Sequence, residues 1–261
     1  MDTVKELFPS IHRVTFPYKD IFTTVTVIRT PKGDAVVDLA SYDEDMDEIL
    51  FPALETLGVT EESLAFAIIT HNHKDHSGGI GRFLEKFPNT AIVTGSQKLR
   101  DTYPTARFCA VEEGDLLLDT LQVVMIPGHT KDALAVLDTR SGTLVCGDCL
   151  QQFGIFGSGL WGSNIRFPAL HLEAVEKLRT LPIEGILSAH DFHPVGFMAT
   201  TKEEVSAFLD ACVDSLKRIR SHVEANPSMT SEELEASYNA PGTLPTVGAH
   251  VFAAIRQDFN L

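Results

Sequence analysis

Short apolar runs alternate along the chain with segments whose apolar residues recur every three or four positions. Short runs bounded by glycine, proline and polar turn residues are typical of strands, and the periodic segments are typical of amphipathic helices. The predicted strands cover residues 22–28, 35–38, 64–69, 91–93, 121–126, 133–137, 144–146 and 185–187. The predicted helices cover residues 43–57 (with a break at Pro52), 80–87, 172–179 and 202–223, and a last short helix is expected within 226–261.

These elements fall into two similar halves, each of which is strand-rich first and helical afterwards. Sheets in the interior with helices on both outer faces would bury the apolar side of every element. We therefore expect one α/β domain over residues 1–261, with the helix and tail at 202–261 packed onto it. A long loop is expected over residues 151–168, where glycines and aromatic residues are frequent.

Four residues that suit a metal ion follow directly after the predicted strand at 64–69. They are His71, His73, Asp75 and His76, and the first two are two positions apart, so an extended backbone points both to the same side. Neutral imidazole and carboxylate are ligands for zinc, iron and manganese. The glycines that follow at 78–79 allow a close approach of the backbone at the start of the next helix.

Three further ligand candidates also follow predicted strands. His129 comes after the strand at 121–126, Asp148 after 144–146 and His190 after 185–187. A lone histidine is usually a core or surface residue, but seven nitrogen or oxygen ligands at the carboxyl ends of strands are unlike a chance placement. The sequence therefore predicts a metal centre at one edge of the sheets.

Composition narrows the partners of such a centre. The chain has 261 residues, 44% of them hydrophobic, and a formal net charge of −15, so nucleic acid and acidic membrane surfaces are unfavourable partners. No apolar run reaches the ~20 residues needed to span a bilayer. Four cysteines are too few for a disulfide scaffold, and residues 1–10 do not resemble an export signal, so we expect reduced thiols and a cytoplasmic location.

The order of these seven residues resembles the motif of the metallo-β-lactamase superfamily, which is His-x-His-x-Asp-His followed by His, Asp and His. Val36-Val37-Asp38 also resembles the strand that precedes the first helix of that family, so the resemblance extends over nearly the whole chain. It implies a four-layer αββα sandwich with a binuclear site at one edge. It further implies that the first metal is held by His71, His73 and His129, the second by Asp75, His76 and His190, and that Asp148 bridges them.

The resemblance also implies the chemistry. Two divalent ions, zinc first with iron or manganese as alternatives, would hold a hydroxide that cleaves an ester, lactone or thioester of a small-molecule substrate. Asp75 would be both a ligand and the proton acceptor. The histidine and aspartate set is similar to the glyoxalase II and lactonase branches, whereas true β-lactamases often have cysteine where this chain has Asp148. A homodimer is compatible with the sequence.

The alternative left open by the sequence is oxidative. The persulfide dioxygenase branch resembles this chain in length and motifs, and it would use one iron on His71, His129 and Asp148 to activate oxygen. The number and identity of the bound metals would distinguish the binuclear hydrolase from the mononuclear iron dioxygenase.

Several other residues have roles that the sequence leaves open. Candidates to orient the imidazoles are Asp38, Thr70, Thr130 and Ser188. Cys146 and Cys149 are expected to be plain buried or loop thiols. No role is assigned to His171, His193 or His250. The loop aromatics Phe153, Phe156, Trp161 and Phe167 would either form an apolar lid over the site or pack against the core or a second copy.

Overall fold

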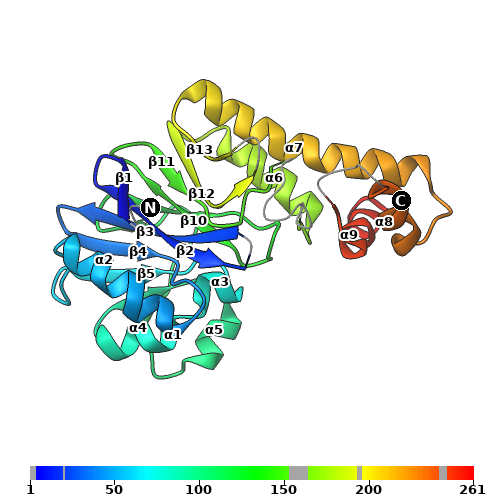
Figure 1. The fold of residues 1–261 in the computed structure, drawn as a ribbon. Helices are drawn as coiled ribbons and strands as arrows, with labels where there is room; N and C mark the ends of the chain where they lie inside the picture. The colour runs from blue at the N-terminus through cyan, green and yellow to red at the C-terminus, as the bar shows by residue number, and fades with distance from the viewer. Residues whose placement is uncertain (1–3, 20, 153–163, 193–195, 241–245) are drawn as a thin grey trace.

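The chain forms two stacked β-sheets with helices on both outer faces (Figure 1). The computed structural model describes residues 4–19, 21–152, 164–192, 196–240 and 246–261. The first sheet has the order β1 (Val4–Phe8), β2 (Ile11–Tyr18), β3 (Ile21–Thr30), β4 (Gly33–Val37), β5 (Leu64–Ile68), β6 (Ala91–Val93) and β7 (Phe108–Cys109). The second has the order β13 (Gly196–Ala199), β12 (Gly185–Phe192), β11 (Thr143–Val145), β10 (Leu134–Asp138), β9 (Leu121–Met125) and β8 (Leu116–Leu117).

Three apolar cores define four layers, which confirms the αββα sandwich. One core lies between the sheets and joins residues such as Val37 and Ile68 to Val123 and Val136. The outer face of the first sheet is covered by α1 (Asp43–Asp45), the π-helical turn Met46–Leu50, α2 (Phe51–Thr56), α4 (Ile80–Lys86) and α5 (Gln97–Thr102). The outer face of the second sheet is covered by α6 (Pro168–Leu178) and the first half of α7 (Lys202–Ala225).

Strand direction brings the functional segments to one edge. In the first sheet β4, β5 and β6 are parallel. In the second sheet β11 and β12 are parallel, and β9 runs in the same direction because both β9 and β11 are antiparallel to β10. The carboxyl ends of β4, β5, β9, β11 and β12 therefore meet at one edge of the sandwich.

The elements differ from the sequence-based predictions mainly at their ends. Pro52 lies at the start of α2, directly after the π-helical turn, so the helical segment changes its hydrogen-bond pattern at this point and continues through the proline. The helix expected over 172–179 begins at Pro168, and the strand expected over 185–187 continues to Phe192. The first extension buries His171 in α6, and the second lets β12 pair with β13 at Phe192 and Gly196.

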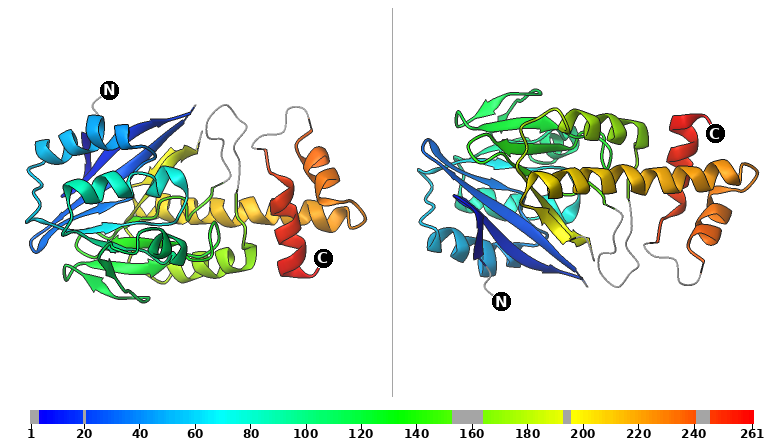
Figure 2. Two further views of the ribbon diagram at one scale, coloured as in Figure 1. Left: turned by 90° about the horizontal axis from the view of Figure 1, so that it is seen from below. Right: turned by 90° about the horizontal axis from the view of Figure 1, so that it is seen from above.

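The described residues of the tail form two helices, whereas a single short helix was expected. These are α8 (Ser231–Tyr238), which begins with a capping box at Thr230 and Glu233, and α9 (Ala249–Phe259). Both views of Figure 2 show α7 reaching away from the sheets to the end where α8 and α9 lie. There the second half of α7 and the two helices share a separate apolar core around Phe252. That the whole chain folds as one domain stays a prediction.

Nowhere in the described ranges is there a helix both long enough and apolar enough to cross a membrane.

Candidate metal centre

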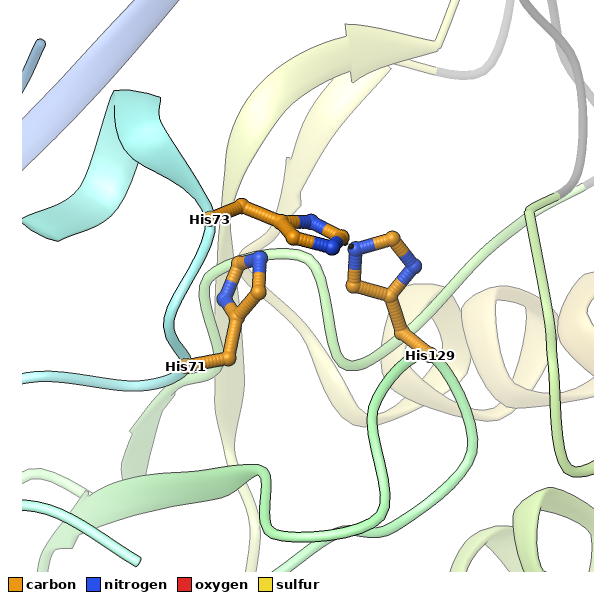
Figure 3. Close-up of side chains that lie close together, drawn as sticks. All are labelled: His71, His73 and His129. Carbon is orange, nitrogen blue, oxygen red and sulfur yellow. Dashed lines mark hydrogen bonds between the residues drawn. The ribbon is translucent and has the colours of Figure 1, made fainter. Parts of the chain in front are cut away.

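Three histidines converge at the edge between the two sheets (Figure 3). His71 and His73 come from the segment after β5, and His129 comes from the segment after β9. Their ring centroids lie 4.6 to 4.9 Å apart, and Nε2 of His129 is 2.9 Å from Nδ1 of His73. One nitrogen from each ring lies within 4.8 Å of the others, which is close enough for a single ion to contact all three.

Four more side chains form a second cluster beside the first. Asp75 and His76 lie on α3 (Lys74–Ser77), Asp148 follows β11, and His190 lies in β12. Nε2 of His190 is 3.2 Å from Oδ2 of Asp75 and 3.2 Å from Oδ1 of Asp148. Nε2 of His76 lies 3.5 Å from the same two oxygens.

Asp148 stands between the two clusters. Its Oδ1 atom is 3.2 Å from Nε2 of His190, whereas its Oδ2 atom is 3.9 Å from Nε2 of His129. One carboxylate thus presents one oxygen to each cluster. A carboxylate in this position can ligate two ions at once, in the arrangement typical of sites whose ions are ~3.5–4 Å apart.

The donor set fits two divalent cations. Nε2 of His71 and Nε2 of His76 are buried, and neither has a hydrogen-bond partner among the described residues. Such atoms are costly unless something satisfies them. Burial lowers the pKa of His129 to about 4, so its imidazole is neutral at pH 7 and keeps a lone pair for a ligand bond.

The second cluster favours positive charge. Burial alone would lower the pKa of His190, but the charge of Asp148 and hydrogen bonds to Asp148 and Asp75 outweigh it and raise that pKa to about 10. Burial would also lower the pKa of His76, but the charges of Asp75, Asp148 and Asp38 outweigh it and raise that pKa well above its usual value. The carboxylates that favour these protons also favour a metal cation, which would displace the protons on binding.

Protein acceptors turn four of the imidazoles toward the clusters. Nδ1 of His76 lies 2.7 Å from Oδ2 of Asp38, and Nδ1 of His71 lies 3.1 Å from Oγ1 of Thr70, which itself bonds Asp38. Nδ1 of His190 lies 2.6 Å from the carbonyl of Phe22, and Nδ1 of His129 lies 2.8 Å from the carbonyl of Asn164. Because carboxylate and carbonyl oxygens only accept, the proton sits on Nδ1 of His76, His129 and His190, and Nε2 is left for a metal.

The other two residues expected to orient imidazoles, Ser188 and Thr130, make no hydrogen bond to an imidazole of the described residues. Oγ of Ser188 donates to the carbonyl of Gly147 at 3.1 Å. Oγ1 of Thr130 is buried and has no hydrogen bond to any residue that the structure describes. Of the four candidates, Asp38 and Thr70 therefore contact the imidazoles directly.

The glycines after the histidine motif allow α3 to approach the end of β4. The backbone N–H groups of Gly78 and Gly79 donate to the carbonyls of Ala40 and Leu39 at 3.0 and 3.1 Å. A Cβ at either glycine would collide with the backbone of Ser41 or Leu39. This contact fixes α3, and with it Asp75 and His76, against the segment that begins with Asp38.

A cavity of about 440 Å³ opens onto the centre. Five of the seven predicted ligands line it, together with residues that sequence reasoning missed: Tyr18, Lys19, Ile21, Lys74, Gln151, Asn164, Glu235, Thr246, Val247 and Gly248. They come from the β2–β3 hairpin, from segments beside the ligands and from the region of α8 and α9. No local pattern marks them, because their proximity to the centre arises only when distant segments pack together.

The unassigned residues have different environments. His250 lines the cavity, whereas His171 is fully buried in α6. Cys146 and Cys149 are buried, and all four cysteines of the chain are free thiols within its described ranges. Phe167 precedes α6 as its N-cap residue. His193 and the loop aromatics Phe153, Phe156 and Trp161 lie outside the described residues.

Comparison with known proteins identifies the family and the fold of the chain. The family model described as Metallo-beta-lactamase superfamily matches residues 18–190. A protein of Synechococcus sp. named hydroxyacylglutathione hydrolase is 34% identical over 168 residues, which cover 60% of this chain and 59% of that protein. A protein of the same name from Crocosphaera subtropica is 28% identical, covering 78% of this chain and 84% of that protein.

A solved structure shares the fold over nearly the full length. It is a metallo-beta-lactamase family protein from Thermus thermophilus, with a TM-score of 0.67 and 17% sequence identity. The superposition covers 96% of this chain and 92% of that one.

Proposed function

Because the chain belongs to the metallo-beta-lactamase superfamily, we propose that it is a metal-dependent hydrolase that cleaves a thioester, ester or lactone at two metal ions. The observation that carries this proposal is Asp148, whose two oxygens face different clusters. His71, His73 and His129 would hold the first ion, Asp75, His76 and His190 the second, and Asp148 both. Zinc is the metal that we propose, with iron and manganese as alternatives.

Asp75 is placed to manage a proton during such a reaction. When bound, two divalent cations lower the pKa of a water molecule between them and polarise the substrate carbonyl. Burial alone would raise the pKa of the Asp75 carboxyl, but the charge of His76 and the hydrogen bond from His190 outweigh it and lower that pKa. The carboxylate is therefore ionised at neutral pH, and it would accept the proton of the attacking water at the oxygen that does not ligate the second ion.

Within this reaction class, we propose a thioester substrate. Two relatives named hydroxyacylglutathione hydrolase support it and favour hydrolysis over the oxygen-dependent alternative. A cavity of about 440 Å³ is the size of a small-molecule site, and its lining joins the ligands to Gln151, Asn164 and His250. A small acyl thioester would reach the centre through it.

Metal analysis of protein purified without chelator tests the first part of the proposal. About two ions per chain are expected. About one iron per chain, with oxygen consumption in the presence of a persulfide, would instead support the oxidative alternative. A protein that binds no metal even after reconstitution would overturn both.

A substrate panel tests the second part. The metal-loaded protein is assayed with a hydroxyacylglutathione, an aliphatic lactone and an aryl ester, with thiol release or acid release as the readout. We expect turnover of the thioester that is lost on chelation and restored by zinc. Turnover of the lactone alone would keep the hydrolase and overturn the thioester assignment.

A further inference from the structure

Asn164 lies where several segments of the centre meet. Its backbone carbonyl lies 2.8 Å from Nδ1 of His129, so this imidazole donates to it and keeps Nε2 toward the first cluster. The backbone N–H of Asn164 donates to Oε1 of Gln151 at 3.4 Å, and Nε2 of Gln151 donates to the carbonyl of Asp148 at 2.9 Å. Asn164 is therefore linked by a hydrogen bond to His129 and, through Gln151, to the backbone of Asp148.

The side chain of Asn164 faces the C-terminal helices. Its Oδ1 atom lies 2.7 Å from Nε2 of His250, in the first turn of α9. Because an amide oxygen only accepts, Nε2 of His250 is the donor. The imidazole also packs so closely on Gly248 that a Cβ there would lie 2.9 Å from the ring, which limits the directions in which the ring can point.

Helix α8 in turn fixes the start of α9. The side-chain amide of Asn239 exchanges two hydrogen bonds with the backbone of Val247, at 2.8 and 2.9 Å. Oε2 of Glu235 accepts from the N–H of Ala249 at 3.0 Å. The residues on both sides of Gly248 are thus tied to α8, so His250 is presented from a fixed backbone.

Residues 164–167 contact both the C-terminal helices and the segment that carries His129. Ile165 is buried in the apolar core of the C-terminal helices, together with Val251 and Phe252. The N–H groups of Arg166 and Phe167 both donate to the carbonyl of Gly128, the residue before His129, at 2.9 Å. Residues 164–167 therefore link the helical end of the chain to the segment that carries His129.

We propose that His250 is a positioning residue for the metal centre: it fixes Asn164, whose carbonyl orients the imidazole of His129. In this role, α8 and α9 do more than border the cavity, because they help to set the geometry of the first metal position. The inference rests on the proposed ligation by His129. Groups that orient a ligand typically change metal affinity about 10- to 100-fold, and His250 acts through one intermediate residue.

The test compares zinc affinities without any substrate. The full chain and a His250→Phe variant are titrated against a chromogenic chelator, and the cobalt-substituted proteins are compared by their visible absorption. We expect about tenfold weaker binding of the more affected ion and a changed cobalt spectrum in the variant. His250→Gln, whose amide can still donate to Asn164, should restore both values toward those of the unchanged chain.

A matched control separates positioning from general stability. His222 on α7 has the same kind of contact, with Nε2 2.8 Å from Oγ of Ser237 on α8, and its ring packs on Phe252. His222→Phe should weaken the helical end of the chain but leave zinc affinity and the cobalt spectrum unchanged. An equal loss of affinity in both variants would overturn the proposal.

A double variant tests the route through Asn164. If His250 acts on His129 only through this residue, His250→Phe combined with Asn164→Ala should bind zinc no more weakly than Asn164→Ala alone. Additive losses would overturn the route. Unchanged zinc affinity in His250→Phe would overturn the inference while leaving the proposed function intact, whereas a chain that binds no zinc at all would remove the proposed function itself.

Discussion

Nδ1 of His76 lies 2.7 Å from Oδ2 of Asp38, a contact that joins helix α3 to the end of strand β4. The same carboxylate accepts from the backbone N–H of Thr70 at 2.8 Å and from its hydroxyl at 2.9 Å. Since the Thr70 hydroxyl also contacts Nδ1 of His71, one aspartate orients an imidazole in each cluster. Asp38 has a positive φ of 65°, a strained conformation that persists here at the centre of this network.

We predict that Asp38→Asn weakens zinc binding by about tenfold or more while the protein still folds. Asparagine tolerates a positive φ, but it loses the charge that holds the proton on Nδ1 of His76. Chelator competition measures the affinity, and thermal unfolding of the metal-free proteins checks the fold. Asp38→Ala should lower both the affinity and the stability, because alanine is strained at this φ. Zinc affinity unchanged in Asp38→Asn would contradict the proposed orienting role.

Asp148→Ala should lower the bound metal from about two ions to about one per chain, because it removes the one side chain shared by both clusters. Hydrolysis should fall below detection in the same preparation. Elemental analysis after gel filtration gives the metal content. Ser215→Ala is a suitable control, since Ser215 is buried on α7 and belongs neither to the two clusters nor to the cavity lining. Two tightly bound ions in Asp148→Ala would argue against bridging.

Removal of the metal should destabilise the fold. Nε2 of His71 is buried, and no described residue satisfies it, so loss of the ions leaves a cost in the folded state alone. At a metal concentration about 100 times Kd, one ion stabilises by about 2.7 kcal/mol. That corresponds to a rise in Tm of roughly 5–10 °C for a chain of this size. Calorimetry with and without chelator measures the shift, and identical curves would be evidence against a metal bound in the folded state.

His171 should make the fold sensitive to acid. Burial lowers its pKa to about 4, whereas the unfolded chain has a histidine pKa of about 6.5. The unfolded state therefore binds more protons between these values, and stability is lost as pH falls from about 6.5 toward about 4. Between about pH 7.5 and about pH 5 this residue accounts for a loss of about 2 kcal/mol.

The variant His171→Leu should lose less stability over the same pH range, because leucine takes up no proton. Neither ring nitrogen of His171 has a hydrogen-bond partner in the part of the chain that is described, so an apolar side chain loses no hydrogen bond there. Urea unfolding of both metal-free proteins at about pH 7.5 and about pH 5 gives the change in the free energy of unfolding for each protein. The same pH dependence in both proteins would show that His171 is not the source.

The seven ligand candidates were within reach of sequence analysis for a physical reason. A metal centre at the ends of parallel strands needs its ligands directly after apolar runs. His71 and His190 both follow such runs in the sequence. The glycines at 78 and 79 could be assigned a close backbone approach for the same reason, since the need is local to the motif. Fold class followed from the alternation of strands and helices and from the family resemblance.

The ends of the helices and the hydrogen-bond partners of individual side chains were harder to predict from the sequence. The described part of the tail at 226–261 holds two helices because α8 and α9 bury apolar residues against α7, and this burial depends on a helix that precedes them in sequence. Thr130 and Ser188 look as suitable as Thr70 in sequence, yet of these three hydroxyls only that of Thr70 contacts an imidazole within the described residues. A hydroxyl can turn toward any of several neighbours, so its partner is decided by packing.

The sequence by itself determined the layered α/β architecture and the set of residues able to bind metal, because periodicity and ligand chemistry are carried by neighbouring positions. Only the tertiary structure decided which oxygen of Asp148 faces which cluster, and that Asn164 and His250 lie within reach of His129. These contacts join residues up to 86 positions apart, from Asn164 to His250. They depend on the relative placement of sheets and helices, which no local pattern encodes.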